Sequence, residues 1–342
     1  MKVSVIVPTY NRAHQIVDTL RSVLAQSWKP HDVIVVDDGS TDRTSSVCAE
    51  FGSAIRFVRQ ANAGVSVARN HGAALAGGDT LAFLDSDDLW HPDKLAIQVA
   101  ALAANPDAGW SITGCDVIGL DGVVLENRRG FPAVFGVFAA TGLEPDAFFR
   151  KYFDEAPVHA GGRSHPAFRG DAFGPLYLGN FALPSSALVR RALFKHAGGF
   201  DPSLRLAEET DFFHRVAALS AVVILTDSLV GYRVGQAGSL ISPANTTRLI
   251  HNALATAERV SSLRQSTPEI AEHRRAGRVM LLRKLAYAEL SALNRGAARE
   301  AIVGSWRSGG PRDPWSIAVY GASLLPGRLL TALHRSKRRL RG

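Results

Sequence analysis

Over the first 115 residues, short apolar runs alternate with stretches whose apolar residues recur three or four positions apart. The short runs predict buried strands and the longer period predicts helices. Strands are predicted at 3–7, 33–36, 55–58, 80–84 and 108–113, with Pro8 ending the first, and helices at 16–24, 43–50, 66–76 and from Pro92 onward. This alternation predicts an α/β fold, with a mainly parallel, Rossmann-like sheet flanked by helices.

The regular pattern stops at Asp116 and returns near Phe181. Residues 116–179 predict loops with a hairpin around Asp121-Gly122. An apolar run at 181–189, a helix ending at Gly198-Gly199, a helix at 208–219 and a strand at 222–225 follow. After Thr246 the pattern is helical, with one apolar face formed by Val279, Leu282, Leu285, Ala286, Leu290 and Leu293. We therefore predict a catalytic domain at 1–240, with halves 1–115 and 116–240, and a helical region at 241–342.

Composition narrows the class of protein. Hydrophobic residues make up 46% and charged residues 20% of the 342 residues, which is typical of a globular protein and excludes a disordered one. The two cysteines, Cys48 and Cys115, exclude a disulfide framework and favour a reducing compartment, so a cytoplasmic location is expected. The apolar run 3–7 is too short for a signal peptide, and no run of ~18 apolar residues predicts a membrane span.

The net charge of +8 is concentrated at the end of the chain. Removing the six basic residues from Arg328 onward leaves +2, so we interpret the basic block as a local feature of the tail and expect no nucleic-acid partner. Apolar residues precede this block: Trp315, Ile317, Val319, Tyr320, Leu324, Leu325, Leu329 and Leu330. Two interpretations fit. One is an interfacial helix with basic anchors, on the inner face of the membrane and near a lipid-linked glycan acceptor. The other is an ordinary helix with a solvated tail.

Polar residues follow three predicted strands, at the edge where parallel sheets bind ligands. The densest group is Asp85-Ser86-Asp87-Asp88. Three carboxylates in four residues repel one another unless a cation lies between them, and Mg²⁺ or Mn²⁺ prefers such oxygen ligands. A helix N-cap cluster is the alternative. The position directly after a buried strand favours the metal site.

Three further motifs each allow two interpretations. Asp37-Asp38 could accept hydrogen bonds from a base or ribose, or could only shape a tight turn. Arg69, one turn into the helix that follows Asn62-Ala63-Gly64, could meet phosphates, or could be a surface arginine beside the acidic clusters. The acidic first turn Glu208-Glu209-Thr210-Asp211 could supply a general base, or could only favour the helix dipole.

Taken together and in order, these motifs resemble those of family 2 glycosyltransferases over roughly residues 1–235. The motifs that carry the resemblance are Val7-Pro8-Thr9-Tyr10-Asn11-Arg12, Val36-Asp37-Asp38-Gly39-Ser40-Thr41-Asp42, Asn62-Ala63-Gly64 with Ala68-Arg69-Asn70, Leu84-Asp85-Ser86-Asp87-Asp88, and Gly198-Gly199-Phe200-Asp201 with Glu208-Glu209-Thr210-Asp211.

The resemblance implies an A-type glycosyltransferase fold and an inverting transfer from a nucleoside diphosphate sugar to an acceptor hydroxyl, in the synthesis of a polysaccharide, lipopolysaccharide or other glycoconjugate. It implies that Asp85 and Asp87 hold Mn²⁺ or Mg²⁺, with Asp87 the direct ligand, and that Glu209 is the base, with Glu208 and Asp211 as the other catalytic candidates. The implied nucleotide-sugar contacts are Pro8, Thr9, Tyr10, Arg12, Asp37, Asp38, Asn62, Gly64, Arg69, Asp85 and Ser86.

Two positions depart from the family pattern. Glu209 stands where the family usually has aspartate, which lengthens the side chain by one methylene group and leaves Glu208 as an alternative base. Many relatives have a histidine shortly after the arginine that corresponds to Arg233, whereas this chain has none there, so Gln236 or water would substitute.

Other functions are less well matched. A nucleotidyltransferase would need a Gly-rich phosphate loop after the first strand, and a dehydrogenase would need G-x-G-x-x-G there. A catalytically silent nucleotide-sugar or carbohydrate-binding protein of the same fold remains the alternative. Aromatic residues of a kind suited to sugar stacking border the expected acceptor site, although for any single one of them core packing is the more usual role: Trp110, Phe131, Phe135 and Phe138.

Overall fold

The computed structural model describes residues 1–126, 131, 136–235 and 245–326. The chain divides into two compact units, Met1–Ser239 and Leu240–Gly342. Each unit is described by itself.

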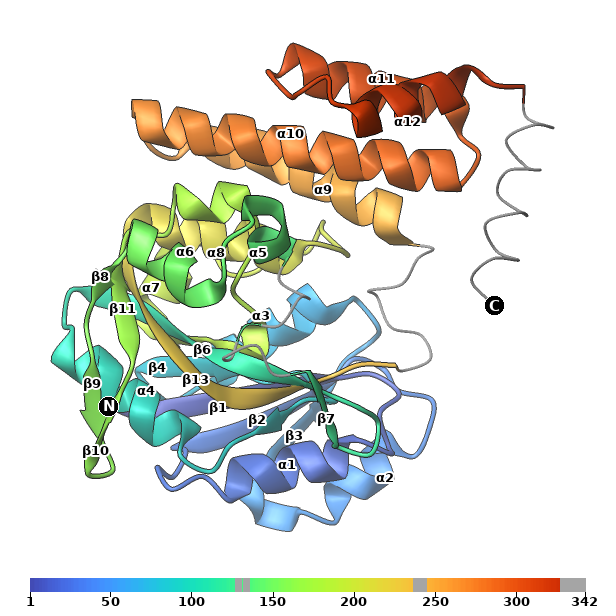
Figure 1. Cartoon of the computed structure of the whole chain (residues 1–342). Helices are drawn as coiled ribbons and strands as arrows, with labels where there is room; N and C mark the ends of the chain where they lie inside the picture. The colour runs from blue at the N-terminus through green and yellow to red at the C-terminus, as the bar shows by residue number, and fades with distance from the viewer. Residues whose placement is uncertain (127–130, 132–135, 236–244, 327–342) are drawn as a thin grey trace. The chain divides into compact units, whose positions relative to one another are not determined.

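The first unit begins with a four-stranded parallel sheet in the order β3-β2-β1-β4. Helices α1 and α2 cover one face of this sheet and α3 covers the other (Figure 1). Right-handed crossovers require this arrangement, because the chain moves outward from β1 to β3 and then returns past β1 to β4. The elements are β1 (Val3–Thr9), α1 (Ile16–Leu24), β2 (Asp32–Asp37), α2 (Thr44–Ala49), β3 (Arg56–Arg59), α3 (Val65–Leu75) and β4 (Thr80–Phe83).

The sheet continues from β4 through β12, β6, β13, β11 and β8. Strand β12 runs antiparallel to both of its neighbours, β6 and β13 pair in parallel, and β11 and β8 are antiparallel. The predicted α/β class is therefore confirmed, with a mixed second half. These elements are β5 (Leu89–Trp90), α4 (Lys94–Ala104), β6 (Ala108–Ile118), β7 (Val124–Glu126), β8 (Asp154–Glu155), β11 (Ala167–Gly170), β12 (Leu188–Arg190) and β13 (Ala221–Arg233).

Pro8 does not end the first strand, as its position in the sequence predicted. Strand β1 runs on to Thr9, and Pro8 is paired in register with Val36 of β2. The carbonyl of Thr9 accepts from Asp38 on the β2 side, whereas that of Ile6 accepts from Leu84 on the β4 side. Neighbouring residues of a strand point to opposite sides, so the nitrogen of Pro8 faces the β4 side. Pairing with β4 has already stopped there at Ile6, so no ladder hydrogen bond is lost.

Residues 116–179 contain more regular structure than the predicted loops. The hairpin is confirmed: β6 pairs with β7 across a turn in which Gly122 has a φ of 81°. The rest of the segment was missed, because its elements are too short to show a period. Besides β8 and β11, they are α5 (Gly136–Thr141), α6 (Pro145–Tyr152) and the hairpin of β9 (Val158–Ala160) with β10 (Arg163–His165).

The aromatic side chains of this region form core and not a sugar-binding surface. Phe131 and Phe138 are buried and pack edge to face, and both contact the ring of Phe149. Trp110 is buried and stacks on Phe213 with 5.4 Å between ring centroids. The sugar-stacking hypothesis is therefore wrong for these three residues, and Phe135 lies outside the described residues.

The loop between α7 (Arg191–His196) and α8 (Glu208–Leu219) is held to α3 by hydrogen bonds, the shortest of them made by Asn70. The amide of Asn70 donates to the carbonyl of Phe200 at 2.7 Å and accepts from its N–H at 2.9 Å. Gly199 has a φ of 67°, and a Cβ atom there would lie 2.6 Å from Oδ1 of Asn70. This double hydrogen bond fixes the chain that leads into α8.

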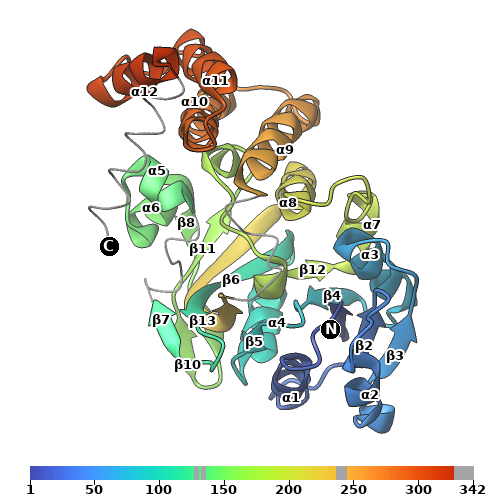
Figure 2. The same ribbon diagram turned by 90° about the vertical axis from the view of Figure 1, so that its right-hand side faces the viewer.

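The second unit consists of α9 (Thr246–Arg259), α10 (Pro268–Ser291), α11 (Arg295–Arg307) and α12 (Pro314–Leu324), which Figure 2 shows alongside one another. The predicted face of α10 is confirmed at Leu282, Leu285 and Ala286, which are buried. It is wrong at Leu293, which follows the helix with a φ of 64°. The core of the unit is Ile250, Leu285, Ala286, Ala301, Ile302 and Val319. In the described part of the chain, no helix combines the length and apolarity needed to cross a bilayer.

Replacing Gly199 by alanine should destabilise the first unit more than the same change at Gly198. Both glycines have positive φ, so each variant carries a conformational cost of about 1–2 kcal/mol. Only at Gly199 would the new Cβ also collide with Asn70, since at Gly198 the nearest atom, Nη1 of Arg215, lies 3.8 Å away. Urea unfolding should show a further loss of about 1–3 kcal/mol for Gly199→Ala. Equal losses would contradict a close approach between Gly199 and Asn70.

Candidate active site

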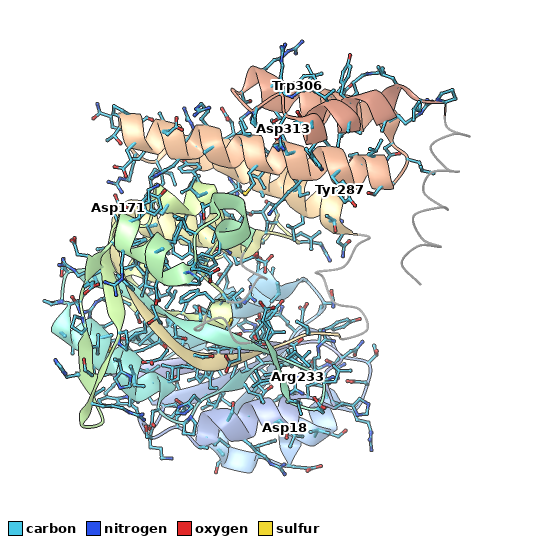
Figure 3. All side chains as sticks on the ribbon, viewed as in Figure 1. Asp18, Asp171, Arg233, Tyr287, Trp306 and Asp313 are labelled. Carbon is cyan, nitrogen blue, oxygen red and sulfur yellow. The ribbon has the colours of Figure 1, made fainter. Side chains whose placement is uncertain are left out.

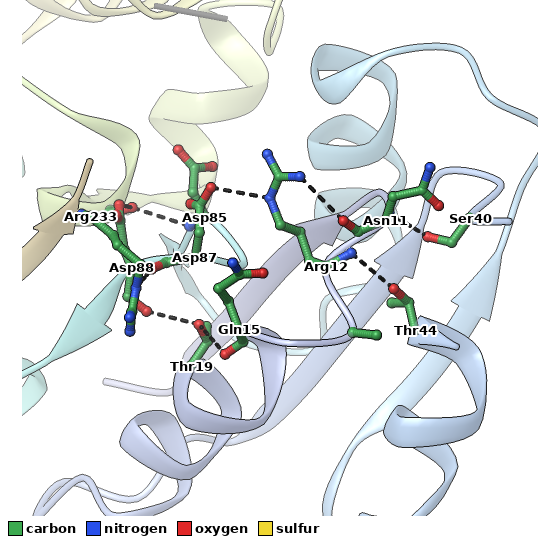
Figure 4. Close-up of polar contacts among 12 residues, drawn as sticks. Asn11, Arg12, Gln15, Thr19, Ser40, Thr44, Asp85, Asp87, Asp88 and Arg233 are labelled. Carbon is green, nitrogen blue, oxygen red and sulfur yellow. Dashed lines mark hydrogen bonds and ion pairs between the residues drawn. The ribbon is translucent and has the colours of Figure 1, made fainter. Parts of the chain in front are cut away.

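The loops after β1 and β2 are joined by hydrogen bonds from Asn11. The backbone N–H of Asn11 donates to Oγ of Ser40 at 2.9 Å, and its side-chain oxygen accepts from the N–H of Thr41 at 2.8 Å (Figure 4). Asn11 has a φ of 52°, a conformation that asparagine tolerates better than most residues. The predicted meeting of polar groups at this edge of the sheet is therefore observed.

Arg12 connects the same loop to the acidic motif after β4. Its Nε lies 3.3 Å from Oδ2 of Asp87, and its backbone N–H donates to Oγ1 of Thr44 (Figure 4). Burial and the neighbouring charge of Asp85 raise the pKa of Asp87, and Arg12 opposes that rise. Arg12 therefore favours the ionised form of Asp87.

Asp88 is the buried anchor of the acidic motif. Its carboxylate accepts from Oγ of Ser185 at 2.6 Å and from the backbone N–H of Arg233 at 3.0 Å. Ser185 in turn accepts from the N–H of Asp85. Burial and the charges of Asp87 and Asp85 raise the pKa of Asp88 well above its ordinary value. These bonds tie the acidic loop to the ends of β12 and β13, so Asp88 faces the protein interior while Asp85 and Asp87 remain partly exposed.

Arg69 joins the acidic motif to the first turn of α8. Its guanidinium donates to Asp85 at 2.6 Å and to Glu208 at 3.0 Å, and it lies over the ring of Phe200 at 4.9 Å. The side chain is 3% exposed, so the interpretation as a surface arginine is wrong. Two segments separated by more than 100 residues therefore meet at one cation.

The three candidate bases differ in their partners. Glu208 is buried against Arg69, and Asp211 is held by the guanidinium of Arg215 at 2.6 and 2.9 Å. Glu209 is partly buried, and desolvation of its carboxyl group together with the charge of Glu208 raises its pKa to about 8. Ala207, just before these residues, has a φ of 61°, a strained conformation for alanine.

Asp37 and Asp38 have different surroundings. Both oxygens of Asp38 accept hydrogen bonds, from the side chain of Gln60 and from the backbone N–H groups of Ala63 and Gly64, at 2.8 to 2.9 Å. Asp38 therefore shapes the loop before α3. Asp37 is fully buried, with one oxygen accepting from Ser40 and the other 3.5 Å from Nε of Arg59.

The remaining predicted contacts lie around this edge with unequal exposure. Tyr10, directly after β1, is 45% exposed, and Asn62 is exposed on the loop before α3. Pro8, Thr9 and Ser86 are buried. The hydroxyl of Thr9 has no hydrogen-bond partner within the described part of the chain. The segment after Arg233, including Gln236, lies outside the described residues.

The residues present fit a divalent cation with few protein ligands. Asp85 and Asp87 lie two residues apart, and among the described residues one oxygen of each pairs with a cation, Arg69 for Asp85 and Arg12 for Asp87. Their other oxygens are suitable ligands for Mg²⁺ or Mn²⁺. Across the residues described, no group of three or more His, Cys, Asp or Glu could hold a metal ion. A cation would therefore need further ligands from a diphosphate or water.

The comparisons with known proteins agree with this geometry. The model of the family described as glycosyl transferase family 2 matches residues 4–196, which is more than half of the chain. The chain belongs to glycosyltransferase family 2. The resemblance predicted from the motifs is thereby confirmed.

One curated relative is a putative teichuronic acid biosynthesis glycosyltransferase, TuaG, from Bacillus subtilis. It is 39% identical over 128 residues, which cover 36% of this chain and 50% of TuaG. The chain also matches three uncharacterised glycosyltransferases from Rickettsia species, of whose length it covers 18%, 64% and 18%. The chain thus spans less than two thirds of the length of these relatives.

Two solved structures support the A-type glycosyltransferase fold. One is TarS 1–349 from S. aureus in complex with UDP, which has a TM-score of 0.56 and 18% identity and covers 94% of this chain and 89% of its own. The other is the mannosyltransferase PcManGT from Pyrobaculum calidifontis in complex with GDP-Man and Mn²⁺. It has a TM-score of 0.55 and 22% identity and covers 98% of this chain and 84% of its own. At these identities the likeness concerns the fold.

Sequence reasoning assigned no role to Ser185, Asn70 or Asp88, which hold the site together. Ser185 follows Pro184 in an apolar run with no polar pattern around it, so no signal could have identified it. Asn70 and Asp88 stand inside recognised motifs, next to Arg69 and Asp87. Their motif positions could have suggested importance, although not the structural role that their hydrogen bonds give them.

Removing the Arg69 guanidinium should destabilise the glycosyltransferase strongly. Arg69→Met leaves Glu208 buried and Asp85 partly buried without their cation, which costs about 3–5 kcal/mol. Adding Glu208→Gln should recover part of that loss, with a coupling of about 1–3 kcal/mol. Urea unfolding of the two single variants and the double variant measures both quantities.

The matched control is Arg21→Met, which removes an exposed guanidinium 3.9 Å from Asp18 on α1. Its cost should stay within about 0.5 kcal/mol. Strictly additive effects of Arg69→Met and Glu208→Gln would contradict a direct ion pair.

Proposed function

We propose that this glycosyltransferase moves a sugar from a nucleoside diphosphate sugar to an acceptor hydroxyl, with inversion at the anomeric carbon and with help from Mn²⁺ or Mg²⁺. The bridge through Arg69 is the observation that carries the proposal. It holds the acidic motif, a site suited to a cation and diphosphate, beside the first turn of α8, which contains a candidate base. The complexes of TarS with UDP and of PcManGT with GDP-Man and Mn²⁺ support the same class of donor.

The donor nucleotide would lie over the ends of β1 and β2. The exposed ring of Tyr10 is available to stack on a base, and the buried side chains of Asp37 and Thr9 would shape the same edge. Asn62 and Gly64 would border the ribose on the loop that Asp38 holds in place. Arg12 and Arg69 supply positive charge close to the acidic motif, where the diphosphate would bind.

A divalent cation bound by Asp87 and Asp85 would neutralise charge that develops on the diphosphate leaving group. Arg12 contacts Asp87 and Arg69 contacts Asp85, so the two arginines orient these two carboxylates toward the donor edge. Ser185 and Asp88 hold the backbone of the loop from behind.

Glu209 is the base that we assign to the acceptor hydroxyl. The carboxylates of Glu208 and Asp211 are already engaged by Arg69 and Arg215, whereas Glu209 has a pKa raised to about 8 and is only partly buried. A carboxylate with a raised pKa is a stronger base at neutral pH. It would take the proton while the hydroxyl oxygen attacks the anomeric carbon opposite the leaving diphosphate, which inverts the configuration.

The donor site belongs to residues 1–115 and we assign the acceptor to 116–240, because α8 lies in the second range. The biosynthetic role of TuaG supports an acceptor in glycan synthesis. The alternative is a silent binding protein of the same fold, which would bind a nucleotide sugar and transfer nothing.

Transfer activity should depend on the protonation of Glu209. Because the base must be ionised, kcat/KM should rise with pH and level off above about 8. Glu209→Gln should lower kcat by about 10²–10⁴-fold and remove this pH dependence, with donor affinity unchanged. Initial rates from pH 6 to 9.5 test both effects.

The same pKa shift predicts a change in stability that needs no substrate. A carboxyl group whose pKa is raised in the folded protein binds its proton more tightly in the folded state than in the unfolded state. The free energy of unfolding therefore falls as the pH rises from the ordinary pKa of glutamate, 4.5, toward 8. Glu209→Gln should lessen that fall. A variant that keeps full activity would sink the assignment of Glu209.

Donor binding should require the cation. In a thermal-shift screen, a nucleoside diphosphate or its sugar should raise the Tm of the protein in the presence of Mn²⁺ or Mg²⁺, and should raise it much less in the presence of EDTA. Asp87→Asn should abolish the metal-dependent part, whereas the exposed control Asp18→Asn should retain it. No shift with any nucleotide would contradict an intact donor site, and a shift without turnover would favour the silent binding protein.

A further inference from the structure

Helix α12 buries its polar side and exposes its apolar side. Facing inward are Ser316, Val319 and Ser323. The hydroxyls of the two serines donate to backbone carbonyls of the same unit. The exposed residues of the helix include no charged or hydrogen-bonding side chain except the indole of Trp315. They are Pro314, Trp315, Ile317, Ala318, Gly321 and Leu324, called the α12 face below.

Apart from Val319, which belongs to the core, this arrangement is the reverse of that in a helix packed on a water-soluble core. Such a helix turns its apolar stripe inward and its polar residues to water. Here Ile317 and Leu324 are 55% and 54% exposed, and Trp315 is 39% exposed. Burying these side chains would be favourable by the hydrophobic effect, so the α12 face is built for an apolar environment.

Arginines border the α12 face. The guanidinium of Arg283 lies over the ring of Trp315 at 4.4 Å and pairs with Asp313, and that of Arg295 donates to the carbonyl of Leu325. Arg312 lies over Trp306 at 5.5 Å. Two of these partners, Trp306 and Asp313, are labelled in Figure 3.

The positive charge extends over the whole second unit and not only its tail. Leu240–Gly342 contains 18 Lys and Arg against 6 Asp and Glu, a net charge of +12, which leaves −4 for Met1–Ser239. The prediction that the basic block is confined to the tail is therefore too narrow, because 12 of those 18 residues precede Arg328.

We propose that the α12 face docks on an anionic lipid surface. Trp315, Ile317 and Leu324 would enter the boundary between headgroups and acyl chains, and the bordering arginines would meet lipid phosphates. Tryptophan is the residue that prefers this depth, because its ring is apolar and its N–H can still find a polar partner. The helix lies on the surface: its 11 residues are too few to span a bilayer.

Charge distinguishes the lipid surface from other occupants. A second copy would bring two units of +12 together, which is electrostatically unfavourable. A nucleic acid would match the charge but would leave Ile317 and Leu324 in water. An anionic bilayer satisfies both the charge and the apolar face.

The test is co-sedimentation of the full chain with vesicles. Phosphatidylglycerol mixed into phosphatidylcholine should bind the protein, phosphatidylcholine alone should bind it much less, and salt should weaken binding because it screens the charges. The double variant Ile317→Ser with Leu324→Ser should reduce partitioning on the order of tenfold, because it removes two apolar side chains about half of whose surface would be buried in lipid. The result does not depend on any sugar-transfer activity.

The matched control is Leu219→Ser with Leu263→Ser, which removes two leucines that are 45% and 46% exposed at other places in the chain. This pair should bind vesicles like the unchanged protein. Circular dichroism should show the same helix content in both double variants, so that loss of binding cannot reflect unfolding.

Three results would overturn the proposal. The protein could fail to bind anionic vesicles, or the α12 pair could bind as well as the control pair. Sedimentation velocity could instead show that the unchanged protein is a dimer and that the Ile317→Ser, Leu324→Ser variant is a monomer, while neither binds vesicles. This result would identify a second copy as the occupant of the α12 face. The protein could also bind single-stranded RNA but no vesicles, and the Ile317→Ser, Leu324→Ser variant could bind that RNA equally well. This result would identify a nucleic acid as the partner of the positive charge.

Discussion

The site depends on one buried cation. Taking Arg69 out of water would be costly by itself, and burying Glu208 or Asp85 without a partner would be costly too. The two ion pairs offset one another's desolvation, so the guanidinium requires both carboxylates and each carboxylate requires the guanidinium. The acidic motif after β4 and the first turn of α8 are consequently fixed together, and Phe200 supports the guanidinium from below through its ring.

A second buried polar network supports the acidic motif from the opposite side. Ser185 accepts from Asp85 and donates to Asp88, and its carbonyl accepts from the indole of Trp90. Beneath Trp90, the Nζ of Lys94 lies 4.0 Å from the ring centroid and donates to Gln98, and burial lowers the pKa of Lys94 well below its ordinary value. Buried polar groups of this kind tolerate little rearrangement, because each lost bond leaves an unsatisfied partner. The loop that presents Asp85 and Asp87 is therefore held rigidly.

The two units separate two kinds of surface chemistry. The glycosyltransferase unit carries −4 and concentrates its carboxylates at the strand ends, where cations from Arg12, Arg69 and a metal would balance them. The helical unit carries +12 and exposes an apolar helix face. The proposed site for a charged donor and the proposed surface for charged lipid would place opposite demands on the protein, and they fall in different units.

Local pattern predicted most elements of the first 115 residues, although not the continuation of β1 past Pro8 or the two-residue strand β5. Strands and helices there are long enough to show a period, and the carboxyl ends of parallel strands meet by topology, so Tyr10, Asp37 and Asp85 could be placed at one edge from the sequence alone. The shorter elements of 116–179 have no such period and were missed. Tertiary structure alone decided which polar groups pair: Arg69 with Glu208, 139 residues away, and Ser185 with Asp88, 97 residues away. It also decided that α12 turns its serines inward. Periodicity records only what neighbours in the chain do together, whereas these pairs and this orientation depend on the free energy of burying groups that the fold brings together from distant segments.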